Sequence, residues 1–424
     1  MINFLLKGII KDKSRSVLPV IVVSIGAALT VILSCWLRGV MGESIEMNAN
    51  FNTGHLKVMT RAYAKQAEQT PNDLALTGTS ELIAKLRSSY TNVDWVQRIR
   101  FNGLIDFPDE KGETRVQGPV TGWAVDLISN SSKEKNRLNL SKSLVKGRLP
   151  ENGSEALLSY ELARKFSVNI GDKFTLFGST MDGSMSFTNF TVSGIVRFGA
   201  SALDRGAIII DIKDAQSGFQ MQDAAGEILG YFNDGIFSEK TATDIKNDFN
   251  GKYKNNKDEF APLMLSLRDQ GGMAEFMDYA DTISSIMLFV FVLAMSIVLW
   301  NAGLLGGLRR YNEFGVRLAL GEEKKHIYKT LVYEAVLIGF IGSFIGTSFG
   351  LAISYYIQMR GIDISGLMEN SSMLMPSVVR TIVAPASFYI GFIPGLVSMV
   401  LGNALSGIGI YKRSTSQLFK ELET

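Results

Sequence analysis

The residue types most able to do chemistry are few and scattered in this chain. It contains one cysteine, Cys35, inside an apolar run, and two histidines, His55 and His326. A single thiol excludes a disulfide or a thiolate metal cluster within one chain, and two distant histidines do not predict a metal site. No catalytic triad or pair of carboxylates stands out. We therefore expect no catalytic residue, no metal and no cofactor in this chain.

Phosphate-binding loops are also missing from the sequence. The pattern G-x-x-x-x-G-K-[ST], whose backbone amides cradle phosphates, does not occur. Gly315 and Gly321 have the wrong spacing for it, and no predicted strand precedes them. ATP and Mg²⁺ are therefore expected on a separate ATPase chain. The net charge of +2 shows no basic excess of the kind that nucleic-acid binding requires.

The segment with the clearest functional pattern is the basic stretch 309–329, whose centre is amphipathic. Its apolar and charged positions interleave at Glu313, Phe314, Val316, Arg317, Leu318, Ala319 and Leu320. A helix of this kind docks in a groove of a partner protein, or it lies on a membrane surface with its basic side chains extended toward water. Periodicity alone leaves both interpretations open.

Four long apolar segments must position this stretch. They cover residues 17–40, 282–308, 330–359 and 381–411. A helix needs about 20 apolar residues to cross roughly 30 Å of hydrocarbon, so we expect four transmembrane helices. The first run is too long for the apolar part of a signal peptide, and no small-residue cleavage site follows it. Pro385 and Pro394 predict kinks in the fourth.

The basic residues predict the orientation of these helices. They gather in segment 1–16, in 309–329 and in the tail 412–424, whereas the loop 360–380 has only Arg360 and Arg380. Lys and Arg concentrate on the cytoplasmic side of membrane proteins. We therefore expect a multi-pass protein of the cell inner membrane with both termini in the cytoplasm and residues 41–281 outside.

Residues 41–281 read as one large α+β domain. Helix patterns at 81–86, with Thr79 and Ser80 as capping residues, and at 239–249 are flanked by strand patterns, which suggests two β-α-β units. Strand patterns surround these helices and fill a β-rich insert at about 135–225; they lie at 55–59, 93–107, 115–120, 173–177, 187–196, 207–212, 227–232 and 262–267.

Several motifs in this chain resemble those of one family of transporter permeases. The run Glu313-Phe-Gly-Val-Arg-Leu-Ala-Leu-Gly321 resembles E-[IF]-G-[IVL]-x-R-A-[LI]-G, with Leu318 in place of the usual arginine and Arg317 one position earlier. Leu144-Val-Lys-Gly-Arg-Leu-Pro150 resembles L-x-x-G-R-x-P, and the stretches 155–163 and 168–172 resemble the segment that follows it. The chain is similar in this respect to the MacB, LolC/LolE and FtsX permeases of ABC transporters.

The resemblance implies a function and a set of partners. It implies a permease that works as a dimer, either with a second copy or with a paralogue, and with a cytoplasmic LolD-like ATPase. The positions that match the coupling motif are Arg310, Glu313, Phe314, Gly315, Arg317 and Gly321. Chain length and the missing ATPase favour lipoprotein release toward the outer membrane, with a lipoprotein substrate and a periplasmic carrier. A MacB-like export permease, an FtsX-like regulator of cell-wall hydrolases and a membrane-anchored sensor without an ATPase remain as alternatives.

Two further sets of residues carry expectations. The junctions between the first two spans and the external domain offer an apolar surface for acyl chains, or merely interfacial anchors, at Trp36, Val40, Met41, Met273, Phe276 and Met277. Gly342, Gly346 and Gly350 form two consecutive G-x-x-x-G units, which allow close approach of helices. We expect them to pack within one protomer rather than to form a dimer seam.

Overall fold

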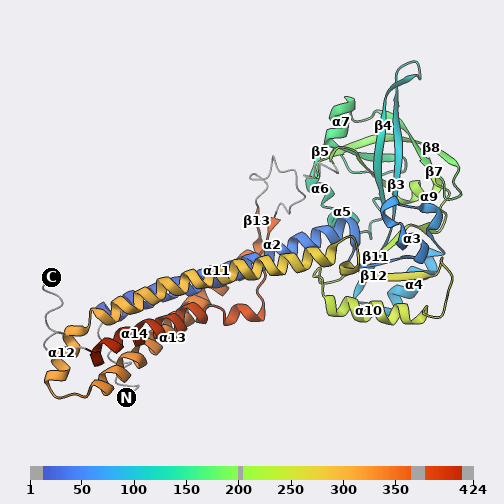
Figure 1. The fold of residues 1–424 in the computed structure, drawn as a ribbon. Helices are drawn as coiled ribbons and strands as arrows, with labels where there is room; N and C mark the ends of the chain where they lie inside the picture. The colour runs from blue at the N-terminus through green and yellow to red at the C-terminus, as the bar shows by residue number, and fades with distance from the viewer. Residues whose placement is uncertain (1–12, 199–203, 364–377, 413–424) are drawn as a thin grey trace. The chain divides into compact units, whose positions relative to one another are not determined.

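The computed structural model describes residues 13–198, 204–363 and 378–412 of the 424-residue chain. The described residues divide into a helical unit, 13–43, 278–363 and 378–412, and an external unit, 44–277. Helices labelled α2 and α11 belong partly to each unit (Figure 1). The predicted class, an apolar helical part with an α+β domain inserted after its first helix, is confirmed.

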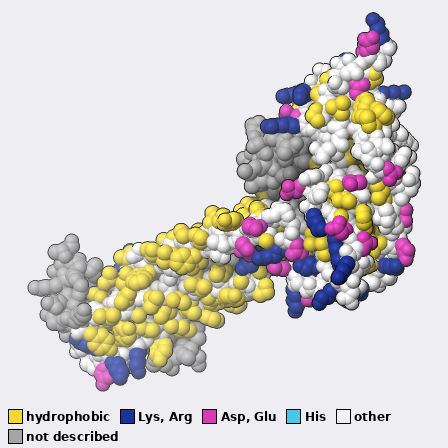
Figure 2. Space-filling view, turned by 45° about the vertical axis from the view of Figure 1, so that its right-hand side comes forward, with side chains coloured by type: hydrophobic (Ala, Val, Ile, Leu, Met, Phe, Trp, Pro, Cys, Tyr) yellow, Lys and Arg dark blue, Asp and Glu magenta, His cyan; other side chains and the backbone are white. Residues whose placement is uncertain are grey.

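The helical unit contains four helical stretches long and apolar enough to cross a membrane. Three of them begin earlier or end later than the apolar runs predict, because a helix continues to satisfy its backbone hydrogen bonds beyond the hydrocarbon. Their bounds are α2 Lys13–Asn48, α11 Met273–Leu308 and α13 Lys324–Arg360, with the short helix α12 Tyr311–Ala319 between the last two. Hydrophobic side chains cover the visible surface of this unit, and charged ones gather at one end (Figure 2).

The fourth stretch is irregular. A 3-10 turn Pro385–Phe388 precedes a π-helical segment Ile393–Ser398, and the regular helix α14, Met399–Lys412, starts only after it. The predicted beginning at residue 381 is therefore wrong by a few residues. Pro385 and Pro394 each lack a backbone N–H, and both stand at the start of an irregular segment. A short ladder, β13 Ile362–Asp363 with β14 Val378–Val379, precedes this region.

The glycines of α13 pack against α2 of the same chain. A Cβ atom at Gly346 would collide with the carbonyl oxygen of Ser24, and one at Gly342 would lie 2.7 Å from Val23 Cγ1. At Gly350 the nearest atom would be the Ala28 carbonyl oxygen at 2.9 Å. The two G-x-x-x-G units therefore form a seam within one protomer.

The base of the external unit is a four-stranded antiparallel sheet in the order β12-β1-β11-β3. Two split β-α-β units interlock in it, because α4 connects β1 to β3 and α10 connects β11 to β12. Leu86 of α4 and Ile245 of α10 pack with Trp95 on one sheet face. The bounds are β1 Leu56–Thr60, α4 Thr79–Ser89, β3 Val93–Pro108, β11 Glu227–Phe232, α10 Glu239–Lys252 and β12 Pro262–Ser266.

The β-rich insert closes into a barrel with the far half of β3. Pairing runs β3-β4-β9-β6-β8 and returns through β7, which pairs with both β8 and β3. Phe107, Phe174 and Ile208 belong to the buried cluster that fills it. The insert therefore begins earlier than residue 135. Its strands are β4 Thr114–Val125, β5 Leu144–Gly147, β6 Glu155–Ser159, β7 Lys173–Ser179, β8 Met185–Val196 and β9 Ala207–Asp211.

Short elements connect these strands. They are the α-helical turns α3 Arg61–Lys65, α5 Glu134–Arg137, α6 Leu140–Ser143, α7 Tyr160–Phe166 and α9 Ile212–Gly218, the 3-10 turns Ala67–Gln69, Asn72–Leu74 and Leu267–Asp269, and the ladder β2 Leu76–Thr77 with β10 Ala224–Ala225. One expectation about α4 is corrected. Thr79 and Ser80 are its first residues, not its caps, and the Asp223 carboxylate accepts the Ser80 N–H at 2.8 Å.

Candidate functional site

The amphipathic stretch folds as α12, and its apolar residues divide between two environments. Phe314 is 1% exposed and lies in a cluster with Tyr311 and with Ile327 and Leu331 of α13. Tyr311 donates a hydrogen bond from its hydroxyl to the Ser406 carbonyl oxygen at 2.7 Å. Gly315 is buried on the same side. These residues fix α12 to its own unit, so Phe314 and Gly315 present no surface to a partner.

The opposite side of α12 is open. Val316 is 47% exposed and Leu320 is 82% exposed. Exposed apolar side chains at this position are accessible to another protein or to lipid. The sequence pattern contained both residues but did not show which apolar positions the protein itself covers.

The charged residues of the coupling motif make ion pairs within the chain. The Arg310 guanidinium lies 2.6 Å from a Glu334 carboxylate oxygen of α13 and 3.4 Å from Glu313. Arg317 binds both carboxylate oxygens of Glu322, at 2.6 and 2.5 Å. This hydrogen bond with Arg317 lowers the pKa of Glu322. These pairs hold α12 in a defined orientation relative to α13.

Gly321 ends the helix. Its φ of +92° is the left-handed conformation that glycine adopts without a Cβ penalty. The Gly321 N–H donates to the Leu318 carbonyl and the Glu322 N–H to the Arg317 carbonyl, both at 3.0 Å. This is the Schellman pattern, and it satisfies carbonyls that the helix end would otherwise leave without partners. Gly321 therefore has a structural role that shapes the loop.

The residues expected at the substrate junctions differ in exposure. Trp36, Val40 and Met41 are half-buried on α2. At the start of α11, Met273 is 4% exposed in a cluster with Ala49 and Leu267, and Met277 packs against it. Phe276 is exposed. Met273 is thus a core residue, and Phe276 is the accessible one of the three on α11.

Where α2 ends, the external unit holds the chain firmly. The helix passes into a π-helical turn, Ala49–Thr53. Arg98 on β3 donates to the carbonyl oxygens of Asn50 and Phe51, at 2.7 and 3.2 Å, and the Tyr231 hydroxyl donates to that of Ala49 at 3.2 Å. A buried cation at a helix C-terminus is favoured by the helix dipole.

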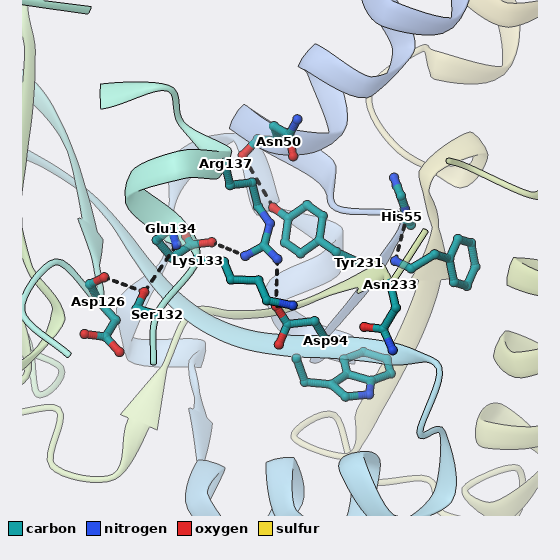
Figure 3. Close-up of polar contacts among 12 residues, drawn as sticks. Asn50, His55, Asp94, Asp126, Ser132, Lys133, Glu134, Arg137, Tyr231 and Asn233 are labelled. Atoms are coloured by element: carbon teal, nitrogen blue, oxygen red, sulfur yellow. Dashed lines mark hydrogen bonds and ion pairs between the residues drawn. The ribbon is translucent and has the colours of Figure 1, made fainter. Parts of the chain in front are cut away.

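A chain of buried ion pairs supports Arg98. Its Nε lies 2.6 Å from a Glu134 carboxylate oxygen. Arg137 lies 2.5 Å from the other oxygen of Glu134 and 2.8 Å from Asp94, and it stacks on the Tyr231 ring (Figure 3). Burial raises the pKa of the Glu134 carboxyl, but the two arginines outweigh burial and hold that pKa below its usual range. The Glu134 carboxyl therefore remains charged at neutral pH.

His55 adds a second anchor. Its Nδ1 accepts the Phe232 N–H at 3.0 Å, so the neutral ring carries its proton on Nε2. That nitrogen lies 2.8 Å from a Glu46 carboxylate oxygen near the end of α2. The only histidine in the external unit is thus a structural residue.

Two glycines mark the start of α11. Gly271 and Gly272 immediately precede it, and both have left-handed φ values, +49° and +73°. A Cβ atom at Gly271 would meet nothing within 4 Å. The chain therefore enters α11 through two consecutive residues with the widest conformational freedom.

Two residues from the sequence motifs meet in the barrel. Arg148 of the L-x-x-G-R-x-P motif pairs through both terminal nitrogens with the Glu155 carboxylate, and this hydrogen bonding lowers the pKa of Glu155 to about 2. The same carboxylate accepts the backbone N–H groups of Glu151 and Asn152. The motif therefore closes the turn before β6.

Two family profiles match this chain. One, described as the MacB-like periplasmic core domain, matches residues 16–248, and the other, the FtsX-like permease C-terminal, matches residues 285–415. Together they match the first helix, most of the external unit and the helices after it.

Curated relatives are distant. The lipoprotein-releasing system transmembrane protein LolC of Xylella fastidiosa (strain Temecula1 / ATCC 700964) is 22% identical over 209 residues, which is 48% of each chain. The macrolide export ATP-binding/permease protein MacB of Psychrobacter arcticus is 30% identical over 112 residues, 26% of this chain and 16% of that protein. The chain thus matches about half the length of the LolC relative and less of MacB.

Among solved structures, the periplasmic region of MacB from Actinobacillus actinomycetemcomitans matches at 10% identity and a TM-score of 0.35, covering 57% of this chain and 95% of that one. The assignment rests instead on the family profiles, the larger of which spans more than half of the chain. The chain belongs to the MacB/LolC/FtsX family of ABC transporter permeases.

Proposed function

We propose that this permease is driven by a separate cytoplasmic ATPase that docks on the open face of α12. The observation that carries the proposal is the division of α12 into a face buried against α13 and a face that exposes Val316 and Leu320. The Arg310–Glu334 pair links the start of α12 to α13, and the Arg317–Glu322 pair spans the turn between the two helices. Movement of an ATPase bound to this face would therefore displace the long helices rather than deform the loop.

The proposed work is mechanical and takes place outside the cytoplasm. Both α2 and α11 continue as unbroken helices from the helical unit into the external unit. Motion of these helices thus reaches the external unit along the backbone itself. We propose that the protein lies in the inner membrane with both termini inside, and that two permease chains work together with two ATPase chains.

The proposed substrate is a lipoprotein held in the outer leaflet of the inner membrane. The similarity to LolC over 209 residues supports this choice, as does the exposed apolar side chain of Phe276 near the first turn of α11. Export of another substrate is the second candidate, and the 30% identity to MacB over 112 residues favours it.

Co-purification tests the coupling face. Val316→Asp or Leu320→Asp is expected to abolish recovery of the ATPase with the permease, because a charge replaces the apolar contact. Val145→Asp, the same change at an exposed valine of the external unit, is the matched control and is expected to retain the ATPase. Equal recovery of the ATPase with all three variants would refute α12 as the docking site.

A photo-crosslinker at Phe276 tests the substrate separately. Capture of a lipoprotein in living cells supports lipoprotein release. Capture of an outer-membrane channel or adaptor instead supports export, and capture of neither refutes a substrate contact at this junction.

A further inference from the structure

A groove of about 610 Å³ is lined by Arg100 and Asn102, which alternate along β3 with Ile99 and Phe101 of the cluster that fills the barrel. Its walls come from β3, β4, β9 and the π-helical turn after α2. The residues that matter for its chemistry are Asn52, Arg100, Asn102, Thr121, Trp123 and Ala207. Its volume falls within the range of small-molecule sites, roughly 300–1,000 Å³.

Two residues that line this groove each carry a buried hydrogen-bond donor without an acceptor. Arg100 Nε and Trp123 Nε1 are buried and have no hydrogen-bond partner among the described residues. Arg100 and Trp123 are directly opposite each other in the β3–β4 register, so the two donors belong to neighbouring side chains. Trp123 is 6% exposed. Buried polar groups in proteins are nearly always satisfied, and both groups can only donate; an occupant that reaches them must therefore bring acceptors.

Among the charged side chains next to the groove, one positive charge lacks a carboxylate partner. Sheet alternation puts Arg98, Arg100 and Glu227 on the same face, turned away from α4 and α10. The buried cations of this region have carboxylate partners: Lys57 with Glu227 at 3.1 Å, Arg98 with Glu134 at 2.6 Å and Arg137 with Asp94 at 2.8 Å. Arg100 has no such partner within the described part of the chain. The positive charge left uncompensated is the one that lines the groove.

The side-chain amide of Asn102, which also lines the groove, already has hydrogen-bond partners. Asn102 already donates to Thr70 Oγ1 and accepts from Thr121 Oγ1, each at 3.2 Å. These bonds fix the polar wall of the groove, and the indole of Trp123 with the methyl of Ala207 supplies an apolar floor. The arrangement therefore combines one guanidinium, one indole N–H and an apolar surface.

We propose that this groove binds a small organic anion, with one carboxylate or phosphate group at Arg100 and an apolar body on Trp123. A guanidinium pairs with either group through parallel hydrogen bonds. The indole N–H adds a third donor, and the apolar floor gives an organic anion an advantage over an inorganic one. The site is independent of the α12 docking face and does not require the proposed transport function.

Fluorine NMR of the full chain in nanodiscs tests this site. The protein has four tryptophans, so 5-fluorotryptophan gives four resonances, each assigned by a Trp→Phe variant. The probes are hexanoate, hexyl phosphate, inorganic phosphate and hexan-1-ol. We expect hexanoate or hexyl phosphate to shift the Trp123 resonance saturably, inorganic phosphate to bind at least about tenfold more weakly, and hexan-1-ol to leave this resonance unchanged.

Arg100→Gln is expected to weaken binding of the anionic probe by at least about tenfold, because a charge-assisted contact is lost. Arg115→Gln removes the same charge from an exposed position on the same hairpin and is expected to bind like the parent. The Trp95 resonance, from a buried residue of β3, reports whether each variant is folded.

Three outcomes would overturn the proposal. They are the absence of a saturable Trp123 shift with both organic anions, an unchanged titration in a folded Arg100→Gln protein, and a parallel response of all four tryptophans, which indicates partition into the bilayer. Equal binding of inorganic phosphate would refute the apolar half of the site. Of the two organic probes, the tighter one identifies the preferred acidic group.

Discussion

Replacing Arg98 by methionine tests the buried contacts that hold the π-helical turn after α2. The change leaves Glu134 buried without one of its two cations and removes the donor to the Asn50 and Phe51 carbonyl oxygens. Removal of one partner from a buried ion pair costs about 3–5 kcal/mol. For a domain of 150–250 residues, each kcal/mol lowers the melting temperature by about 2–4 °C. We therefore expect Arg98→Met to lower the melting temperature of the external unit by roughly 6–20 °C.

The assay is thermal unfolding of the full chain in nanodiscs, followed by tryptophan fluorescence, with hydrogen exchange of the peptide around residues 45–60. Exchange is expected to rise at Gly54, whose N–H donates to the Ala49 carbonyl oxygen at 2.8 Å. The double variant Arg98→Met/Glu134→Leu removes both charges, so it is expected to recover part of the loss. The remaining deficit then combines the lost capping of the π-helical turn with the lost Glu134–Arg137 pair.

Arg115→Met serves as the matched control, because this exposed arginine lies 3.7 Å from Asp172 at the surface and such pairs contribute about 0–1 kcal/mol. If Arg98→Met and Arg115→Met unfold at the same temperature, the buried network does not stabilise the external unit and the reasoning fails.

Three other predictions follow from separate features. Gly346→Val is expected to separate α13 from α2 and to lower the fraction of protein that stays monodisperse after heating, whereas Gly306→Ala, where a Cβ would meet nothing within 4 Å, should have little effect; equal behaviour of both would contradict the intramolecular seam. The pKa of Glu155 is lowered to about 2 by Arg148, below its unfolded value of about 4.3, so its stabilisation is present above that value and lost as the pH falls toward 2. Glu155→Gln should therefore unfold earlier than the parent at neutral pH and converge with it near pH 2, and a constant difference across this range would refute the pairing. Cysteines at Ser131 and Ser179 should react with membrane-impermeant thiol reagents in cells with a permeable outer membrane, and one at the exposed Lys325 should not; labelling of Lys325→Cys from outside would reverse the orientation.

Local structure followed closely from local pattern. The strand predicted at 227–232 matches β11, and the helix predicted from residue 239 begins there as α10. Both segments carry their own periodicity and end at residues that favour turns or caps. The four apolar spans were equally evident, since their length and lack of charge suffice.

Contacts between distant segments did not follow from the sequence. Barrel closure depends on the pairing of Leu104 with Phe177, and the carboxylate that accepts the Ser80 N–H at the start of α4 comes from Asp223. Neither partner has a local signal, because a side chain or strand edge is satisfied by whatever the fold brings near it. The open and covered faces of α12 are a third example: amphipathicity showed that an apolar face exists, but only the packing of Ile327 and Leu331 on Phe314 shows which apolar side chains remain for a partner.

Helices α2 and α11 join the helical unit to the external unit, and their ends in the external unit have different surroundings. The end of α2 is fixed by Arg98, Tyr231 and the Glu46–His55 contact, while α11 starts after Gly271 and Gly272 in left-handed conformations. The end of α2 is therefore held by side-chain hydrogen bonds, whereas the first residue of α11, Met273, is held by apolar packing against Ala49 and Leu267. Ala49, which directly follows α2, and Met273 share one buried cluster, so displacement of either helix end from this cluster would expose apolar surface of both.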